Sequence, residues 1–66
     1  MIENVEVAYC MAKFEDAIRW EKESADIYLD CNEGKQDATY NRMIARWSTM
    51  ISMFELAFGV SYFKQY

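Results

Sequence analysis

The chain has 66 residues, a mass of 7.9 kDa and a net charge of −4, and 53% of its residues are hydrophobic. A chain this short buries only about 60% of the surface that its unfolded form exposes, so we expect one small domain without a deep catalytic pocket. The hydrophobic content is well above that of disordered segments, so the chain is expected to fold. Histidine is absent, and with it the Ser-His-Asp and Cys-His sets of nucleophilic enzymes and the usual metal ligands. We therefore expect a non-enzymatic protein with no cofactor and no metal.

The charge balance bears on partners and location. Eleven acidic residues against seven basic ones give an isoelectric point near 4.6, which argues against a surface that neutralises phosphates. Direct nucleic-acid binding is therefore not expected. Glu3 and Glu6 lie where a secretory signal would carry Lys or Arg, and no long apolar run follows them. These features predict a cytoplasmic protein.

The first predicted element is a helix over residues 4–31, which no Gly or Pro interrupts. Its expected core face comprises Val7, Cys10, Met11, Phe14, Ala17, Ile18, Ala25, Tyr28 and Leu29, widened by Tyr9, Trp20, Ile27 and Cys31. Within one continuous helix, Cys10 and Cys31 are about 31 Å apart, far beyond the reach of a disulfide. We expect two reduced, partly buried thiols that act as small apolar residues.

A turn over residues 32–36 and a second helix over residues 37–63 follow. Gly34 suits the left-handed position just after a helix, and Asp37 suits the N-cap of the next helix. The expected core stripe of the second helix comprises Tyr40, Ile44, Trp47, Ile51, Phe54 and Phe58, flanked by Met43, Met50 and Ala57. Two helices of similar length joined by a short turn predict an all-α antiparallel hairpin that fills residues 1–66 as one domain.

The back of the second helix suggests a second chain. Ala45, Ser52 and Gly59 recur every seven residues, and small residues let two helix backbones approach closely. A helix that is apolar or small on two sides is normally buried between neighbours, and one hairpin supplies only one. This face is therefore the expected interface of a homodimer that forms a four-helix bundle. A monomer with a weakly polar spare face is the alternative.

A turn centred on Gly34 also predicts which residues face each other. Phe14 is expected opposite Phe54, and Asp26 is expected to pair with Arg42. Charge favours the hairpin, because residues 1–31 carry eight acidic and three basic side chains and residues 38–66 carry one and three. Glu21 lies within the apolar stripe near Arg46. It is either a buried ion-pair partner that fixes the register, a functional carboxylate, or a Glu whose stem lies along the core while its head reaches solvent.

The first helix also carries an acidic face, which comprises Glu15, Asp16, Glu23, Asp26 and Asp30. Carboxylates spaced along a rigid helix can imitate a phosphate backbone and occupy the basic groove of a nucleic-acid-binding protein. Spacings of four between Glu15 and Arg19 and between Lys22 and Asp26 instead indicate a solvated face with internal ion pairs. Both interpretations stay open from the sequence.

The segment of residues 50–63 carries a single charge. It is too short to span a bilayer, which takes about 20 apolar residues, and it lacks the basic residues of interfacial helices, so membrane association is not expected. Methionine and aromatic side chains form adaptable contact surfaces. The hydrophobic partner-binding residues predicted from this segment are Leu56, Tyr62, Phe63 and Tyr66.

Three functions are compatible with this pattern. The leading hypothesis is a small acidic protein that binds another protein and modulates or inhibits it sterically. By analogy of size and charge alone, it could be an accessory inhibitor of a phage or mobile element, such as an anti-CRISPR protein. The alternatives are a homo-oligomeric structural or assembly protein, and a nucleic-acid mimic that uses the acidic face.

Overall fold

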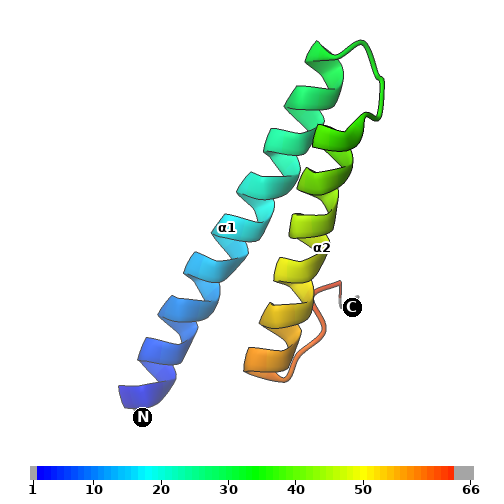
Figure 1. Ribbon diagram of the computed structural model, residues 1–66. Coiled ribbons are helices and arrows are strands. Elements are labelled where there is room, and N and C mark those ends of the chain that lie inside the picture. Colours follow the sequence, from blue (N-terminus) through cyan, green and yellow to red (C-terminus); the bar gives the residue numbers. More distant parts are fainter. Residues whose placement is uncertain (1, 64–66) are drawn as a thin grey trace.

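The computed structural model describes residues 2–63, and side chains from Val5 onward. Two antiparallel helices, α1 (Ile2–Cys31) and α2 (Ala38–Phe58), account for most of this range, which contains no strand (Figure 1). The chain measures 49 × 23 × 16 Å along its principal axes. The predicted all-α helical hairpin is confirmed. Its association into a four-helix bundle stays a prediction.

The turn between the helices is closed by the left-handed residues expected there. Gly34 has φ 76°, and its backbone N–H donates to the carbonyl of Leu29 at 2.8 Å, which satisfies a helix-end acceptor as in a Schellman-type cap. Glu33 also has a positive φ, 59°, which is uncommon for a residue with a side chain. The Asn32 side-chain amide donates to the carbonyl of Lys35 at 2.9 Å and ties the loop across itself.

Both ends of α2 are capped, but its C-terminus differs from the prediction. Asp37 is the N-cap, and its carboxylate accepts the Tyr40 backbone N–H at 2.9 Å, which satisfies one of the free amides of the first turn. At the other end, Gly59 adopts φ 67° and its N–H donates to the carbonyl of Glu55. The prediction of a helix up to residue 63 is therefore wrong, because Gly59 ends the helix instead of continuing it.

The core is small and lies between the two helices. Among the side chains that the structure describes, four hydrophobic ones are buried, namely Ile18, Ala25, Ile51 and Phe54. Around the cluster of Ile18, Ile51 and Phe54 pack the partly buried side chains of Met11, Phe14, Trp47, Met50, Phe58 and Tyr62. The predicted facing of Phe14 and Phe54 is confirmed, since their rings meet edge-on with centroids 5.5 Å apart. This contact fixes the register of the hairpin.

The buried sector of α1 is narrower than predicted. Tyr9, Trp20 and Ile27, which were expected to widen the core, are all more than half exposed. Val7 and Ala17 are exposed as well, and so are both free cysteines, Cys10 and Cys31. The expectation of partly buried thiols is therefore wrong. In a hairpin each helix has a single neighbour, so only one sector of its circumference can be covered.

Candidate functional site

The chain after α2 folds back along the helix and packs its aromatic rings against the hairpin (Figure 1). Tyr62 lies edge-on to Phe54 with ring centroids 5.7 Å apart, and its backbone N–H donates to Glu55 at 2.9 Å. Phe63 packs against Trp47 with ring centroids 6.0 Å apart. Two of the predicted partner-binding aromatics therefore contact their own hairpin. Leu56 is 88% exposed, and Tyr66 lies outside the described residues.

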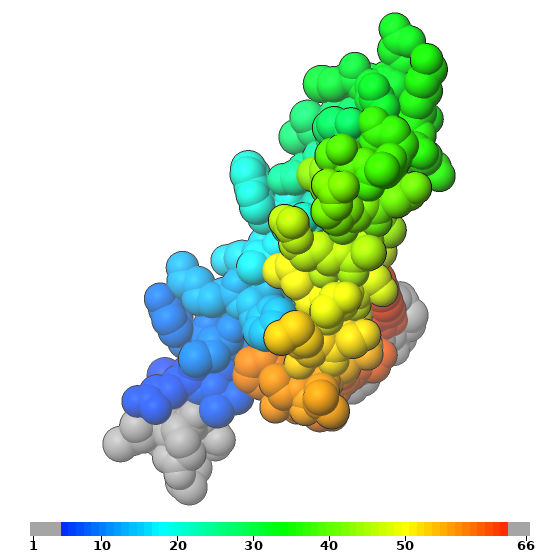
Figure 2. Space-filling model, viewed as in Figure 1, coloured from blue at the N-terminus to red at the C-terminus, as the bar shows by residue number. Residues whose placement is uncertain are grey.

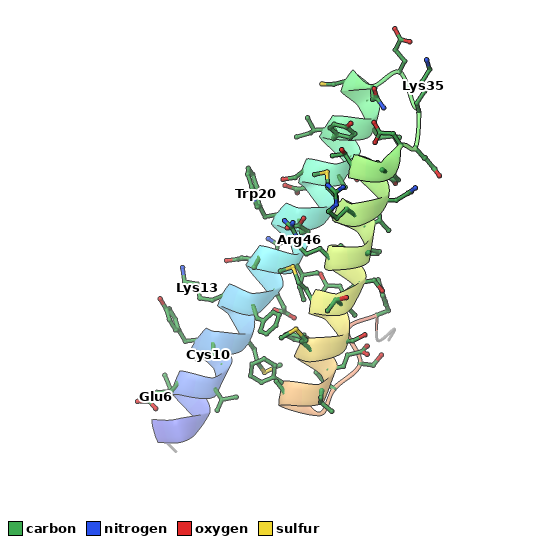
Figure 3. The ribbon with its side chains drawn as sticks, in the orientation of Figure 1. Glu6, Cys10, Lys13, Trp20, Lys35 and Arg46 are labelled. Carbon is green, nitrogen blue, oxygen red and sulfur yellow. The ribbon has the colours of Figure 1, made fainter. Side chains whose placement is uncertain are left out.

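Phe63 is nevertheless 56% exposed, and two further exposed aromatic residues lie on α1. Tyr9, Lys13, Trp20 and Ile27 project from the side of α1 that faces away from α2, and we call them the outer stripe. Trp20 is 66% exposed, and the Lys13 ammonium lies 5.6 Å from the centre of the Tyr9 ring. Figure 3 shows Lys13 and Trp20 pointing away from α2. The rigid helix therefore presents two aromatic rings and an isoleucine to solvent.

The acidic face predicted on α1 is present but partly neutralised. Four of its members, Asp16, Glu23, Asp26 and Asp30, are exposed, and Glu15 is half-buried. Arg19 pairs with Asp16 at 3.2 Å, and Lys22 pairs with Asp26 at 3.1 Å. Asp26 is therefore held by its own helix, not by Arg42 as predicted. Such exposed pairs contribute less than about 1 kcal/mol each, but they interrupt the run of negative charge that a nucleic-acid mimic requires.

Glu21 forms the one ion pair found between the helices among the side chains of residues 5–63. Its carboxylate lies 3.6 Å from the guanidinium of Arg46, and its side chain is 15% exposed, whereas that of Arg46 is 61% exposed. The prediction that Glu21 lies near Arg46 is confirmed. Among the three interpretations of Glu21, this contact favours the ion-pair partner that fixes the register.

The small residues predicted as a dimer interface are not all on one helix face. Ala45 and Ser52 are exposed on α2, but Gly59 lies beyond its last turn as the cap. The predicted stripe of three therefore contains only two helical residues.

Shifted titrations in the described chain occur at the turn, where a hydrogen-bond network joins the helices. The Asp37 carboxylate accepts the Tyr28 hydroxyl at 2.6 Å and the Asn32 amide at 3.1 Å. The Tyr28 hydrogen bond, followed by the Tyr40 backbone N–H, lowers the pKa of Asp37 below its ordinary value. The same bond to Asp37, followed by desolvation, raises the pKa of the Tyr28 hydroxyl. Because Asp37 is also a helix cap, we assign this network a structural role: it holds the turn and the adjoining helix ends together.

Several classes of site receive no support within the described residues. No group of three or more Cys, Asp or Glu side chains there is arranged to hold a metal ion, and no helix there combines the length and the hydropathy needed to cross a bilayer. Comparison of the chain with protein-family models, curated proteins and solved structures gave no match. The features that remain to suggest a function are the exposed surfaces of the hairpin.

Sequence reasoning placed Tyr9, Trp20 and Ile27 of the outer stripe on the core face, although a usable signal was present. Tyr9, Trp20 and Ile27 lie opposite Ile18 and Phe14 when successive residues of α1 are rotated by about 100°. One neighbouring helix cannot cover both sides. The acidic residues Asp16 and Glu23, interleaved with the stripe in sequence, also mark this side as the solvent side.

Proposed function

We propose that this chain is a non-catalytic protein that binds another protein and modulates or inhibits it sterically, with the outer stripe of α1 as the binding surface. The observation that carries the proposal is the exposure of Trp20 between Tyr9 and Ile27 on a rigid helix. Tryptophan and tyrosine dominate the binding energy of protein interfaces because they bury a large area with few rotatable bonds. A steric modulator needs such an anchor and no catalytic groups.

The charges around the outer stripe indicate what kind of partner surface would be complementary to it. Glu23 and Asp30 are exposed acids without an ion-pair partner in the described chain, and Asp16 lies next to the stripe. A partner with an apolar groove edged by Lys or Arg would bury the aromatic rings and pair with these carboxylates. An accessory inhibitor from a phage or mobile element, as in the anti-CRISPR class, fits this size and charge.

The proposed setting is the cytoplasm. Both cysteines are free thiols, as is usual in a reducing compartment.

The second part of the proposal is that the chain works as a homodimer in the form of a four-helix bundle. Support comes from the small size of the core, which contains four buried hydrophobic residues among the described side chains. A single core in a chain this small rarely supplies more than about 3–5 kcal/mol, and association is one way in which small proteins gain further burial. If no outside partner exists, self-association becomes the function itself, and the chain is an assembly protein.

A pull-down from the cells that express the gene tests the binding surface. The wild-type chain is compared with Tyr9→Ala/Trp20→Ala/Ile27→Ala and with Leu56→Ala, which removes an exposed hydrophobic residue from α2. We expect quantitative mass spectrometry to find a protein that the triple variant loses and the Leu56 variant retains. Purified, that protein should change its activity or complex formation when the wild-type chain is added. Equal recovery by all three chains would overturn the proposed surface.

A further inference from the structure

One broad side of the hairpin is bare and largely uncharged, and we call it the front face. The following side chains share it: Cys10, Phe14, Ala17, Glu21 and Ser24 of α1, and Met43, Arg46, Met50, Met53 and Ala57 of α2. The contact between Glu21 and Arg46 shows that these two helix sectors lie on the same side of the molecule. Figure 3 is viewed from this side, with Arg46 over the space between the helices.

The opposite side of the hairpin is already occupied. Lys22 lies 5.6 Å from the centre of the Trp47 ring, and Phe63 packs on that same ring with centroids 6.0 Å apart. The folded-back C-terminal segment therefore lies on the side that carries Lys22 and its partner Asp26. The front face has no such cover within the described residues.

Two contacts across the hairpin show which front-face residues of α1 and α2 lie side by side, and we call each such pair a row. Phe14 faces Phe54, and Glu21 faces Arg46, so residues whose numbers sum to about 67 or 68 lie at the same level. Ala17 is then level with Met50. In the same way, Ser24 is level with Met43 and Cys10 with Ala57. Two rows thus place a small residue of α1 beside a methionine of α2, and one row places an acid beside a base.

From this arrangement we infer that two copies of the chain stack front face to front face about a two-fold axis parallel to the helices, with both turns at the same end. This assignment rests on the proposed homodimer and specifies its interface. In this arrangement α1 of each copy lies on α2 of the other, so Met50 meets Ala17 of the second copy. Each helix then has antiparallel neighbours, as in an up-down-up-down bundle.

Charge favours this axis over the alternative two-fold axis, which runs across the hairpin and would stack α1 on α1 and α2 on α2. With the parallel axis, Glu21 of each copy faces Arg46 of the other, and the four charges alternate in a closed ring. Arg46 is 61% exposed in the hairpin, and a guanidinium has five N–H donors, so it has donors for a second carboxylate. The perpendicular axis would place Glu21 on Glu21 and Arg46 on Arg46, which is repulsive.

The hairpin is elongated (Figure 2), at 49 × 23 × 16 Å along its principal axes, and exposes 5156 Å². A compact monomer of its mass exposes about 4,400 Å², so the hairpin has surface to bury against a second copy. A standard specific interface takes roughly 800 Å² from each partner. The front face is also close to neutral, so a second copy meets no net repulsion there, unlike on the acidic outer side of α1.

Mass and thiol reactivity test the dimer and its interface separately. Light scattering over a dilution series should give the mass of two chains, and a single-chain mass at all concentrations would overturn the homodimer itself. Cys10 and Cys31 are both exposed in the hairpin, but only Cys10 belongs to the front face. At dimer-forming concentrations, maleimide should label Cys10 about tenfold more slowly than Cys31, because labelling then requires dissociation. A dimer in which both thiols react equally would overturn the front face alone.

Two matched alanine variants give a second test. Ala17 and Ala45 are both exposed on helices, but Ala17 lies in the front face and Ala45 on the outer side of α2. Ala17→Glu should weaken the dimer by at least about 100-fold because it buries unpaired carboxylates, whereas Ala45→Glu should leave it intact. Circular dichroism of both variants checks that the helices persist. The reverse pattern would return the interface to the small residues of α2.

A charge exchange tests the axis. The double variant Glu21→Arg/Arg46→Glu keeps its own ring alternating, so it should dimerise with itself. Mixed with the wild-type chain, it would place like charges together, and native mass spectrometry should show mixed dimers below the statistical half. A statistical or larger share of mixed dimers would overturn the parallel axis.

Discussion

The two ends of the hairpin are held together in different ways. At the turn end, the helices are joined by backbone geometry and hydrogen bonds, with Asp37 accepting from Tyr28 and Asn32, and Gly34 donating to Leu29. Ala25 is the one fully buried residue that lies near this end. The covalent loop keeps the helices close here, so little apolar burial is needed.

At the open end, the helices are held together by packed aromatic rings. Phe54 is 1% exposed and contacts the rings of Phe14, Phe58 and Tyr62. In Figure 1 the helices lie further apart toward this end, where no loop joins them. The comparison teaches that a two-helix unit can close one end with local hydrogen bonds, but must hold the other by burying side chains from distant parts of the chain.

The largest effect should come from the open end. Phe54→Ala removes the ring that the other aromatics share, and truncation of a buried phenylalanine typically costs about 3–5 kcal/mol. For a chain this small, that is a large part of the free energy of unfolding, which is about 3–10 kcal/mol. Urea denaturation followed by circular dichroism measures the loss. Leu56→Ala, an apolar truncation at a site of the same helix that is 88% exposed, should change the stability little.

Gly34→Ala should have the next largest effect and act only at the turn. The positive φ of Gly34 is costly for a residue with a Cβ, about 1–2 kcal/mol, although no atom lies close enough to clash with the added methyl. Gly34→Asn should cost less, since asparagine adopts this conformation more readily. Equal denaturation midpoints for the wild-type and alanine chains would show that the turn contributes nothing to stability.

Asp37→Ala should destabilise the hairpin less than Phe54→Ala, because the cap and the network are exposed to solvent. It removes the acceptor for Tyr40, Tyr28 and Asn32 together. Asp37→Asn keeps an acceptor for the helix amide and should retain part of the stability. Thermal melts of the wild-type, Asp37→Ala and Asp37→Asn chains rank their melting temperatures. An asparagine variant as unstable as the alanine variant would indicate that the charge of Asp37 outweighs its capping role.

The smallest effects should be those of pH, and they act on the turn end alone. The pKa of Asp37 is lowered in the folded chain, so its contribution is present above its ordinary value and is lost as the pH falls through the folded value. The pKa of Tyr28 is raised, so its contribution is present below pH 10.0 and is lost as the pH rises through the folded value. Tyr28→Phe should abolish the alkaline loss in a pH series of thermal melts. A loss that persists in that variant would show that the Tyr28 hydroxyl is not its source.

Local signals made the turn end predictable from the sequence. Gly34 and Asp37 are residue types that favour helix caps, and both are found at caps. The contact of Phe14 with Phe54 follows from counting residues in both directions from the turn. The end of α2 at Gly59 was not predictable in this way. Apolar residues continue beyond it in helical spacing, so the sequence left open whether Gly59 would continue the helix or cap it. In the structure Gly59 caps the helix, and Tyr62 packs on Phe54 where the chain turns back.

The surfaces were harder to predict than the fold. About half of the residues are hydrophobic, so α1 has apolar side chains around much of its circumference, and periodicity alone could not say which sector faces α2. The position of the core sector left Trp20 outside and Ile18 inside. The acidic residues Asp16 and Glu23, interleaved with the outer stripe, were the signal that could have decided this from the sequence.

The short loop also sets the order in which the hairpin can fold. Tyr28 and Asp37 are nine residues apart in the sequence, whereas Phe14 and Phe54 are forty apart. Closing a short loop costs less chain entropy than closing a long one, so pairing is expected to begin at the turn and proceed toward the open end, as in other rapidly folding helical proteins with local contacts. During synthesis α1 emerges first, and its outer aromatic residues stay accessible to chaperones and partners before and after α2 pairs with it.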